Sequence, residues 1–112
     1  MTAVFRIELN ADWDRDYNTG QPHPAPTLFT RSFWLDPLEV CVGYWLRAEK
    51  LPAGVSIQIN HQHICDLEHI GAINIEVTDA VWLEKNIITL SMKYPTSNLP
   101  FSGLILEAIP CE

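Results

Sequence analysis

The chain has 112 residues, of which 47% are hydrophobic and 19% are charged, a balance typical of a folded protein and not of a disordered one. Fourteen acidic residues against seven basic ones give a formal net charge of -7, so phosphate backbones and anionic membrane surfaces would be repelled. Length and charge therefore predict one soluble domain over residues 1–112, with neither nucleic acid nor a membrane as its partner.

Short runs of alternating apolar and polar residues recur along the chain, and each predicts a β-strand with one buried face. After a first strand over 4–9, residues 10–26 are rich in Asp, Asn and Pro and predict the longest loop. Further strands are expected over 28–35, 39–48, 55–60, 64–65, 73–77, 87–92 and 104–109. This succession of short strands predicts an all-β fold, an antiparallel β-sandwich.

Two polar stretches between these strands are predicted to reverse the chain. Asn60 and His61 begin the first, because Asn tolerates the positive φ that a tight hairpin needs. Thr78 and Asp79 begin the second, where they are expected to cap a single helical turn over 80–83.

Three turn features follow one another along the chain. They are a strand that ends in an Asn hairpin, then a Val-Thr-Asp corner, and then an Asn before the next strand. The residues that form this series are Asn60, Thr78, Asp79 and Asn86, and the match spans residues 40–109. The series resembles the jelly-roll sugar-binding domain of family 2 glycoside hydrolases and, more broadly, the galactose-binding-like superfamily. In family 2 enzymes this domain is accessory and carries no catalytic carboxylate. The resemblance therefore implies a noncatalytic jelly-roll module that binds a carbohydrate-like ligand or a protein partner.

Four tryptophans are many for this length, and an exposed indole offers an apolar face to a sugar ring. Trp34 and Trp45 lie inside apolar strands, so they are predicted to be core residues. Trp13 lies between two aspartates in the long loop with Tyr17 nearby, and these two residues are the candidate ligand-binding aromatics. Packing of Trp13 within its own loop is the alternative.

The hairpin histidines His61 and His63 are further candidates for ligand binding. Residues two apart on a strand share a face, and imidazole is a good ligand for transition metals. With Glu68, they match the first half of the cupin motif that binds iron, manganese or zinc, so a cupin-like metal-binding protein is one alternative function. The fourth cupin ligand has no counterpart downstream, and exposed hairpin histidines are the competing interpretation.

Asp12, Asp14, Asp16 and Asn18 place oxygen donors at alternate positions, as at the start of a calcium-binding loop. Tyr17 stands where an EF-hand needs glycine, so that motif is excluded. A solvated acidic loop is the competing interpretation. No cofactor is the main expectation, with calcium or a transition metal as the alternatives.

Cys41, Cys65 and Cys111 form an odd set without a CxxC pair, which favours reduced thiols and a buried Cys41. The first residues carry no signal-peptide pattern, which predicts a cytoplasmic location. No serine lies in a Gly-x-Ser-x-Gly motif, and no pair of acids stands out for glycosidase chemistry, so an enzyme is the less favoured class. A small homo-oligomeric assembly protein is the remaining alternative.

Overall fold

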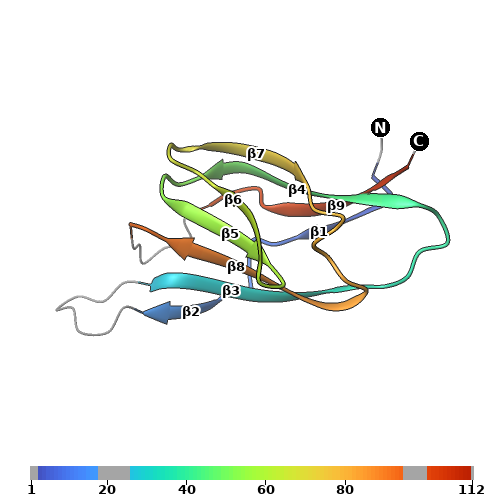
Figure 1. Ribbon diagram of the computed structural model, residues 1–112, viewed down its shortest axis with the longest axis horizontal. Coiled ribbons are helices and arrows are strands. Elements are labelled where there is room, and N and C mark those ends of the chain that lie inside the picture. The colour runs from blue at the N-terminus through green and yellow to red at the C-terminus, as the bar shows by residue number, and fades with distance from the viewer. Residues whose placement is uncertain (1–2, 18–25, 95–100, 112) are drawn as a thin grey trace.

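The computed structural model describes residues 3–17, 26–94 and 101–111, except for the side chains of residues 16, 17, 26 and 27. Within these ranges, nine strands form two antiparallel sheets that pack face to face (Figure 1). The four-stranded sheet has the order β1 (Phe5–Glu8), β9 (Ile105–Pro110), β4 (Val42–Leu51) and β7 (Gly71–Glu76). The five-stranded sheet has the order β2 (Asp14–Tyr17), β3 (Pro26–Leu35), β8 (Glu84–Met92), β5 (Val55–Ile59) and β6 (Gln62–Asp66). The predicted all-β antiparallel sandwich is confirmed.

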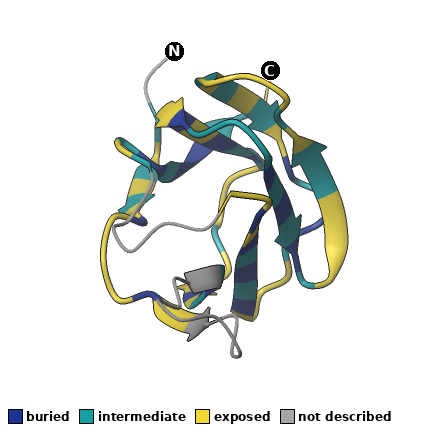
Figure 2. Ribbon diagram, turned by 90° about the vertical axis from the view of Figure 1, so that its left-hand side faces the viewer, coloured by how far each residue is buried: buried dark blue, intermediate teal, exposed yellow. Residues whose placement is uncertain are grey.

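The core lies between the two sheets and is built from every second residue of each central strand. Figure 2 shows this alternation as buried and exposed bands along the strands. On β5, Val55, Ile57 and Ile59 are all buried, as their spacing predicted. The described residues form no helix long and apolar enough to cross a membrane.

The same alternation corrects the prediction for Trp34. Its neighbours Phe33 and Leu35 are buried, so Trp34 points to the opposite side of β3, where its side chain is 59% exposed. Trp45 alternates with buried Tyr44 and Leu46 and is partly exposed on the outside of the other sheet. Neither tryptophan is therefore a core residue.

The segments between strands differ from the sequence prediction at two places. The long loop predicted over 10–26 contains β2, whose residues pair with the start of β3. The helical turn predicted over 80–83 does not form there; a single turn lies earlier, over 78–80, where the amides of Ala80 and Val81 both donate to the Val77 carbonyl at 2.9 and 3.2 Å. The hairpin prediction is confirmed, since Asn60 and His61 have φ values of 53° and 66°.

The prediction of reduced thiols is wrong for two of the three cysteines, because Cys41 and Cys111 form a disulfide. The antiparallel register explains the pairing. Val42 lies opposite Pro110 on β4 and β9, so the residues just outside this pair meet with their Cα atoms 5.4 Å apart. Cys41 is exposed rather than buried, and Cys65 on β6 is the free cysteine among the described residues.

Candidate functional site

Trp13 does not present a stacking face to solvent, which corrects its assignment as an exposed binding residue. Its side chain is 7% exposed and packs edge to face against Phe101, with ring centroids 5.2 Å apart. The indole Nε1 donates to the Leu9 carbonyl at 2.8 Å. The buried ring and its satisfied N–H make Trp13 a residue of the hydrophobic core. Tyr17 ends β2, and its side chain lies outside the described part of the structure.

His61, His63 and Glu68 do not come together as a metal site. His61 lies in the β5–β6 turn, His63 on β6 and Glu68 after β6, and all three are exposed. Across residues 3–17, 26–94 and 101–111, no three His, Cys, Asp or Glu side chains are grouped to hold a metal ion. His63 instead pairs with Asp66, with 3.1 Å between Nε2 and Oδ1. Hydrogen bonds from Ser56 and then from His63 hold the pKa of Asp66 below its usual range.

The predicted calcium ligands do not lie in one loop of the described structure. Asp12 precedes β2, whereas Asp14 and Asp16 belong to this strand, so the segment is not a continuous ligand loop. Asn18 lies outside the described residues.

The residues that carry the sequence resemblance have a structural role. The Asn86 side chain is fully buried, and its Oδ1 accepts hydrogen bonds from the Trp82 amide at 2.7 Å and from Asn60 Nδ2 at 2.8 Å. Asn60 Oδ1 in turn accepts the Ile87 amide at 2.9 Å. The side-chain amides of Asn60 and Asn86 together connect the β5–β6 hairpin to the turn before β8. Because these groups are satisfied inside the protein, they hold the corner of the sandwich and do not face a ligand.

A different group of side chains gathers on the outer face of the four-stranded sheet. Strand pairing places Arg6 of β1 opposite Glu107 of β9, Glu107 opposite Trp45 of β4, and Trp45 opposite Glu76 of β7. These four residues form a row across the sheet, with neighbouring strands about 4.8 Å apart. Strand alternation puts further residues on the same side, and we call the set the Trp45 face: Arg6, Glu8, Trp45, Arg47, Glu49, Asn74, Glu76, Ile105 and Glu107.

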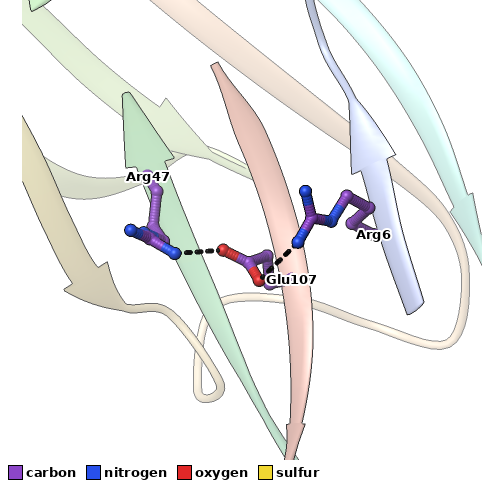
Figure 3. A network of polar contacts seen from close by, with 3 residues as sticks. All are labelled: Arg6, Arg47 and Glu107. Carbon is purple, nitrogen blue, oxygen red and sulfur yellow. Dashed lines mark hydrogen bonds and ion pairs between the residues drawn. The ribbon is translucent and has the colours of Figure 1, made fainter. Parts of the chain in front are cut away.

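Glu107 is the centre of the charged part of this face. Its carboxylate lies between two guanidinium groups, as Figure 3 shows, with Arg47 Nη1 at 2.7 Å from Oε1 and Arg6 Nη2 at 3.7 Å from Oε2. The Glu107 side chain is 5% exposed, whereas those of Arg6 and Arg47 are 61% and 51% exposed. The buried carboxylate therefore orients two arginines whose remaining N–H donors reach solvent.

The other end of the row is held by hydrogen bonds and by a glycine. Thr78 Oγ1 accepts the Tyr44 amide at 3.0 Å and donates to Glu76 Oε2 at 2.9 Å, which fixes the Glu76 carboxylate. A Cβ at Gly43 would lie 3.2 Å from Glu76 Oε2 and 3.6 Å from Trp45 Nε1. The missing side chain of Gly43 thus leaves room for Glu76 and the indole edge to lie over β4.

Beside this row the surface is hollowed. A depression of about 540 Å³ is lined by residues that include Arg6, Arg47, Glu49 and Asn74. A smaller hollow of about 350 Å³ lies between the edge strands β6 and β7, where His63 and Glu76 contribute to its walls. The sequence contained a signal for the larger hollow on β4, whose outward positions carry Trp45, Arg47 and Glu49 while Tyr44, Leu46 and Ala48 point inward.

No protein-family model matches the sequence, and no curated protein matches it either. Solved structures do resemble the fold. A family 2 glycosyl hydrolase from Bacteroides cellulosilyticus superposes with a TM-score of 0.57 over 72% of this chain, at 21% sequence identity. A β-glucuronidase from Bifidobacterium dentium matches all of the chain with a TM-score of 0.70 at 13% identity, and one from Dictyoglomus thermophilum matches 98% of it with a TM-score of 0.69 at 11% identity.

The match covers a small part of each enzyme. This chain spans 12% of the Bacteroides protein, 31% of the Bifidobacterium enzyme and 29% of the Dictyoglomus enzyme. At sequence identities this low, the similarity shows a shared fold and not a shared binding site. The resemblance expected from the sequence is thereby confirmed for the architecture: the chain has the β-sandwich fold of a domain found in family 2 glycoside hydrolases.

Proposed function

We propose that this chain is a noncatalytic carbohydrate-binding module and that the Trp45 face is its binding surface. The observation that carries the proposal is the row in which Trp45 lies between Glu107 and Glu76, because it combines a partly exposed indole with polar groups on both sides. An aromatic ring offers an apolar face to the C–H groups of a sugar, and charged side chains beside it offer hydrogen bonds to the hydroxyls. The shared fold with family 2 glycoside hydrolases supports this choice of ligand.

The state of the two carboxylates supports binding rather than hydrolysis. A glycosidase holds two acids against the scissile bond, one on each side. Glu107 is almost fully enclosed by its strand and two arginines, and the Glu76 carboxylate accepts a hydrogen bond from Thr78. Glu76 is exposed, but the enclosed Glu107 has little access to a substrate oxygen, so the two do not offer the pair of available acids that hydrolysis needs.

The ligand is to be sought among both neutral and acidic sugars. The Bifidobacterium dentium β-glucuronidase is described in complex with coumarin-3-O-glucuronide, so uronates belong in the panel of probes. A printed oligosaccharide array is a suitable first screen, followed by titration calorimetry of any sugar that binds.

Two tryptophan variants test the location of the site. We expect Trp45→Ala to weaken binding of an array-positive oligosaccharide at least tenfold, since the indole is the apolar centre of the face. Trp34→Ala is the matched control, because Trp34 is more exposed but lies on the other sheet. Binding that survives Trp45→Ala and disappears with Trp34→Ala would move the site to the five-stranded sheet. Circular dichroism of both variants checks that the fold is kept.

A protein partner and a homo-oligomer are the predictions that compete with a sugar ligand. Light scattering distinguishes the second, because a monomer has a mass of 12.7 kDa. A larger mass that persists on dilution, together with an array on which no sugar binds, would favour assembly as the function.

A further inference from the structure

We infer that the Trp45 face binds uncharged sugars and discriminates against those that carry a carboxylate or sulfate. This inference rests on the proposed function and names the ligand class of the same surface. It is not an extension of the glucuronidase likeness, which would suggest an acidic sugar. It follows instead from the charges, hydrogen-bonding groups and ion pairs of the face.

The charges of the face favour a neutral ligand. Its positive groups are the two guanidiniums of Arg6 and Arg47, whereas its negative groups are four carboxylates, contributed by Glu8, Glu49, Glu76 and Glu107. The excess is negative, and the whole chain also carries a formal charge of -7. An anionic ligand would approach against this field, whereas an uncharged sugar would not sense it.

The arginines are already paired, which removes the usual reason to expect an anion beside them. Arg47 donates to Glu107 at 2.7 Å, and Arg6 approaches the other carboxylate oxygen at 3.7 Å. A ligand carboxylate would have to share these cations with a carboxylate that the protein already supplies. The free N–H groups of the arginines can still donate hydrogen bonds to the oxygen of a sugar hydroxyl, which carries no charge.

The hydrogen-bonding groups of the face include both donors and acceptors. Arg6 and Arg47 supply donors, the Glu76 carboxylate supplies acceptors, and the Asn74 amide supplies both. A hydroxyl donates and accepts, so neighbouring hydroxyls of one sugar can satisfy groups of both kinds. A carboxylate or sulfate only accepts, and it would leave Glu76 and Glu49 facing another anion. The mixed face therefore matches a neutral polyol.

The test compares matched probes on the full chain. The array carries xylo-oligosaccharides with and without a glucuronate branch, and galacto-oligosaccharides with and without sulfate. We expect the neutral member of at least one pair to bind at least tenfold more tightly than its acidic partner at low salt. The double variant Glu8→Gln, Glu49→Gln should narrow that difference, because it removes two negative charges at exposed positions without touching Glu107 or its arginines.

The outcomes separate this inference from the proposed function. Equal binding of neutral and acidic partners, lost in Trp45→Ala, would overturn the preference for neutral sugars and leave the binding module in place. Tighter binding of the acidic partner, lost in Arg47→Gln, would overturn it in favour of an anion site in the Arg-lined hollow. Failure of every probe to bind would overturn the proposed function itself. A preference for the neutral partner that is lost in Trp45→Ala supports both.

Discussion

Arg47 Nη1 donates to Glu107 Oε1 at 2.7 Å, although the two residues are 60 positions apart in the sequence. The contact exists because β4 and β9 pair antiparallel, with Arg47 opposite Ile105 and Glu107 opposite Trp45. It thus joins a buried carboxylate to an exposed cation diagonally across two strands, where such pairs contribute to sheet stability. The same register brings the partly exposed Trp45 next to this pair, so one strand pairing creates both parts of the proposed site.

Removal of the Glu107 carboxylate is expected to destabilise the fold. Glu107→Ala would leave Arg6 and Arg47 without their shared acceptor and open a gap on β9, and we expect the free energy of unfolding to fall by about 1–3 kcal/mol. Urea unfolding measures this loss. Glu8→Ala is the control: this exposed carboxylate makes no ion pair within the described residues, and its change should stay within about 0.5 kcal/mol. Equal losses of stability in the two variants would show that the contacts of Glu107 with Arg6 and Arg47 do not stabilise the fold.

Asn86 is expected to be the most sensitive polar residue of the corner. Asn86→Ala removes the acceptor of the Trp82 amide and of Asn60 Nδ2 in a buried place, so we expect a loss of about 2–4 kcal/mol of stability. Thermal or urea unfolding measures it. Asn74→Ala, at an exposed position of β7, is the matched control and should be close to neutral for stability. A neutral Asn86→Ala would contradict the structural role assigned to the corner.

The sequence predicted the sandwich and the position of most strands because period-two alternation is a local signal. The same signal, carried through β3, would also have placed Trp34 outside, since Phe33 and Leu35 occupy the inward positions. The burial of Trp13 had no such signal. It depends on Phe101, which lies 88 positions further along the chain and meets the indole only after the sheets have paired. Contacts of this kind are set by tertiary register, which no local pattern contains.

The pairing of His63 with Asp66 predicts a pH dependence. Hydrogen bonds from Ser56 and His63 lower the pKa of Asp66 from its usual value of 3.8 in the folded state. Because the pKa of Asp66 is lower in the folded than in the unfolded state, the ionised carboxylate stabilises the fold at any pH above the unfolded-state pKa. This stabilisation is lost as the pH falls from the unfolded-state pKa through the lower folded-state pKa. We expect His63→Ala to raise the Asp66 pKa, and carbon-detected NMR titration of the carboxyl group measures it. An unchanged titration in His63→Ala would leave Ser56 as the cause of the shift.

The disulfide could not be predicted from the sequence because, like the contact between Trp13 and Phe101, it depends on how distant strands pair. Cys41 and Cys111 are 70 positions apart, and only the β4–β9 register brings them together, with the Cys111 amide donating to the Cys41 carbonyl at 2.9 Å. Disulfides persist chiefly in oxidising compartments. The cytoplasmic location expected from the sequence therefore stays a prediction that the redox state of these two residues can test.

Thiol counting gives the last prediction. The folded, unreduced protein is expected to show no free thiol at Cys41 or Cys111 by alkylation and peptide mass spectrometry. Cys65 should react slowly until the protein is denatured, because burial, and then the charge of Asp66, raises the pKa of its thiol.

A Cys41→Ser, Cys111→Ser double variant should lose about 2–4 kcal/mol of stability under oxidising conditions, since the bond closes a long segment of the chain. Reduction of the unmodified protein should cause a similar loss and leave the double variant unchanged. Equal stability with and without reductant would mean that strand pairing, and not the disulfide, holds the end of β9 on β4.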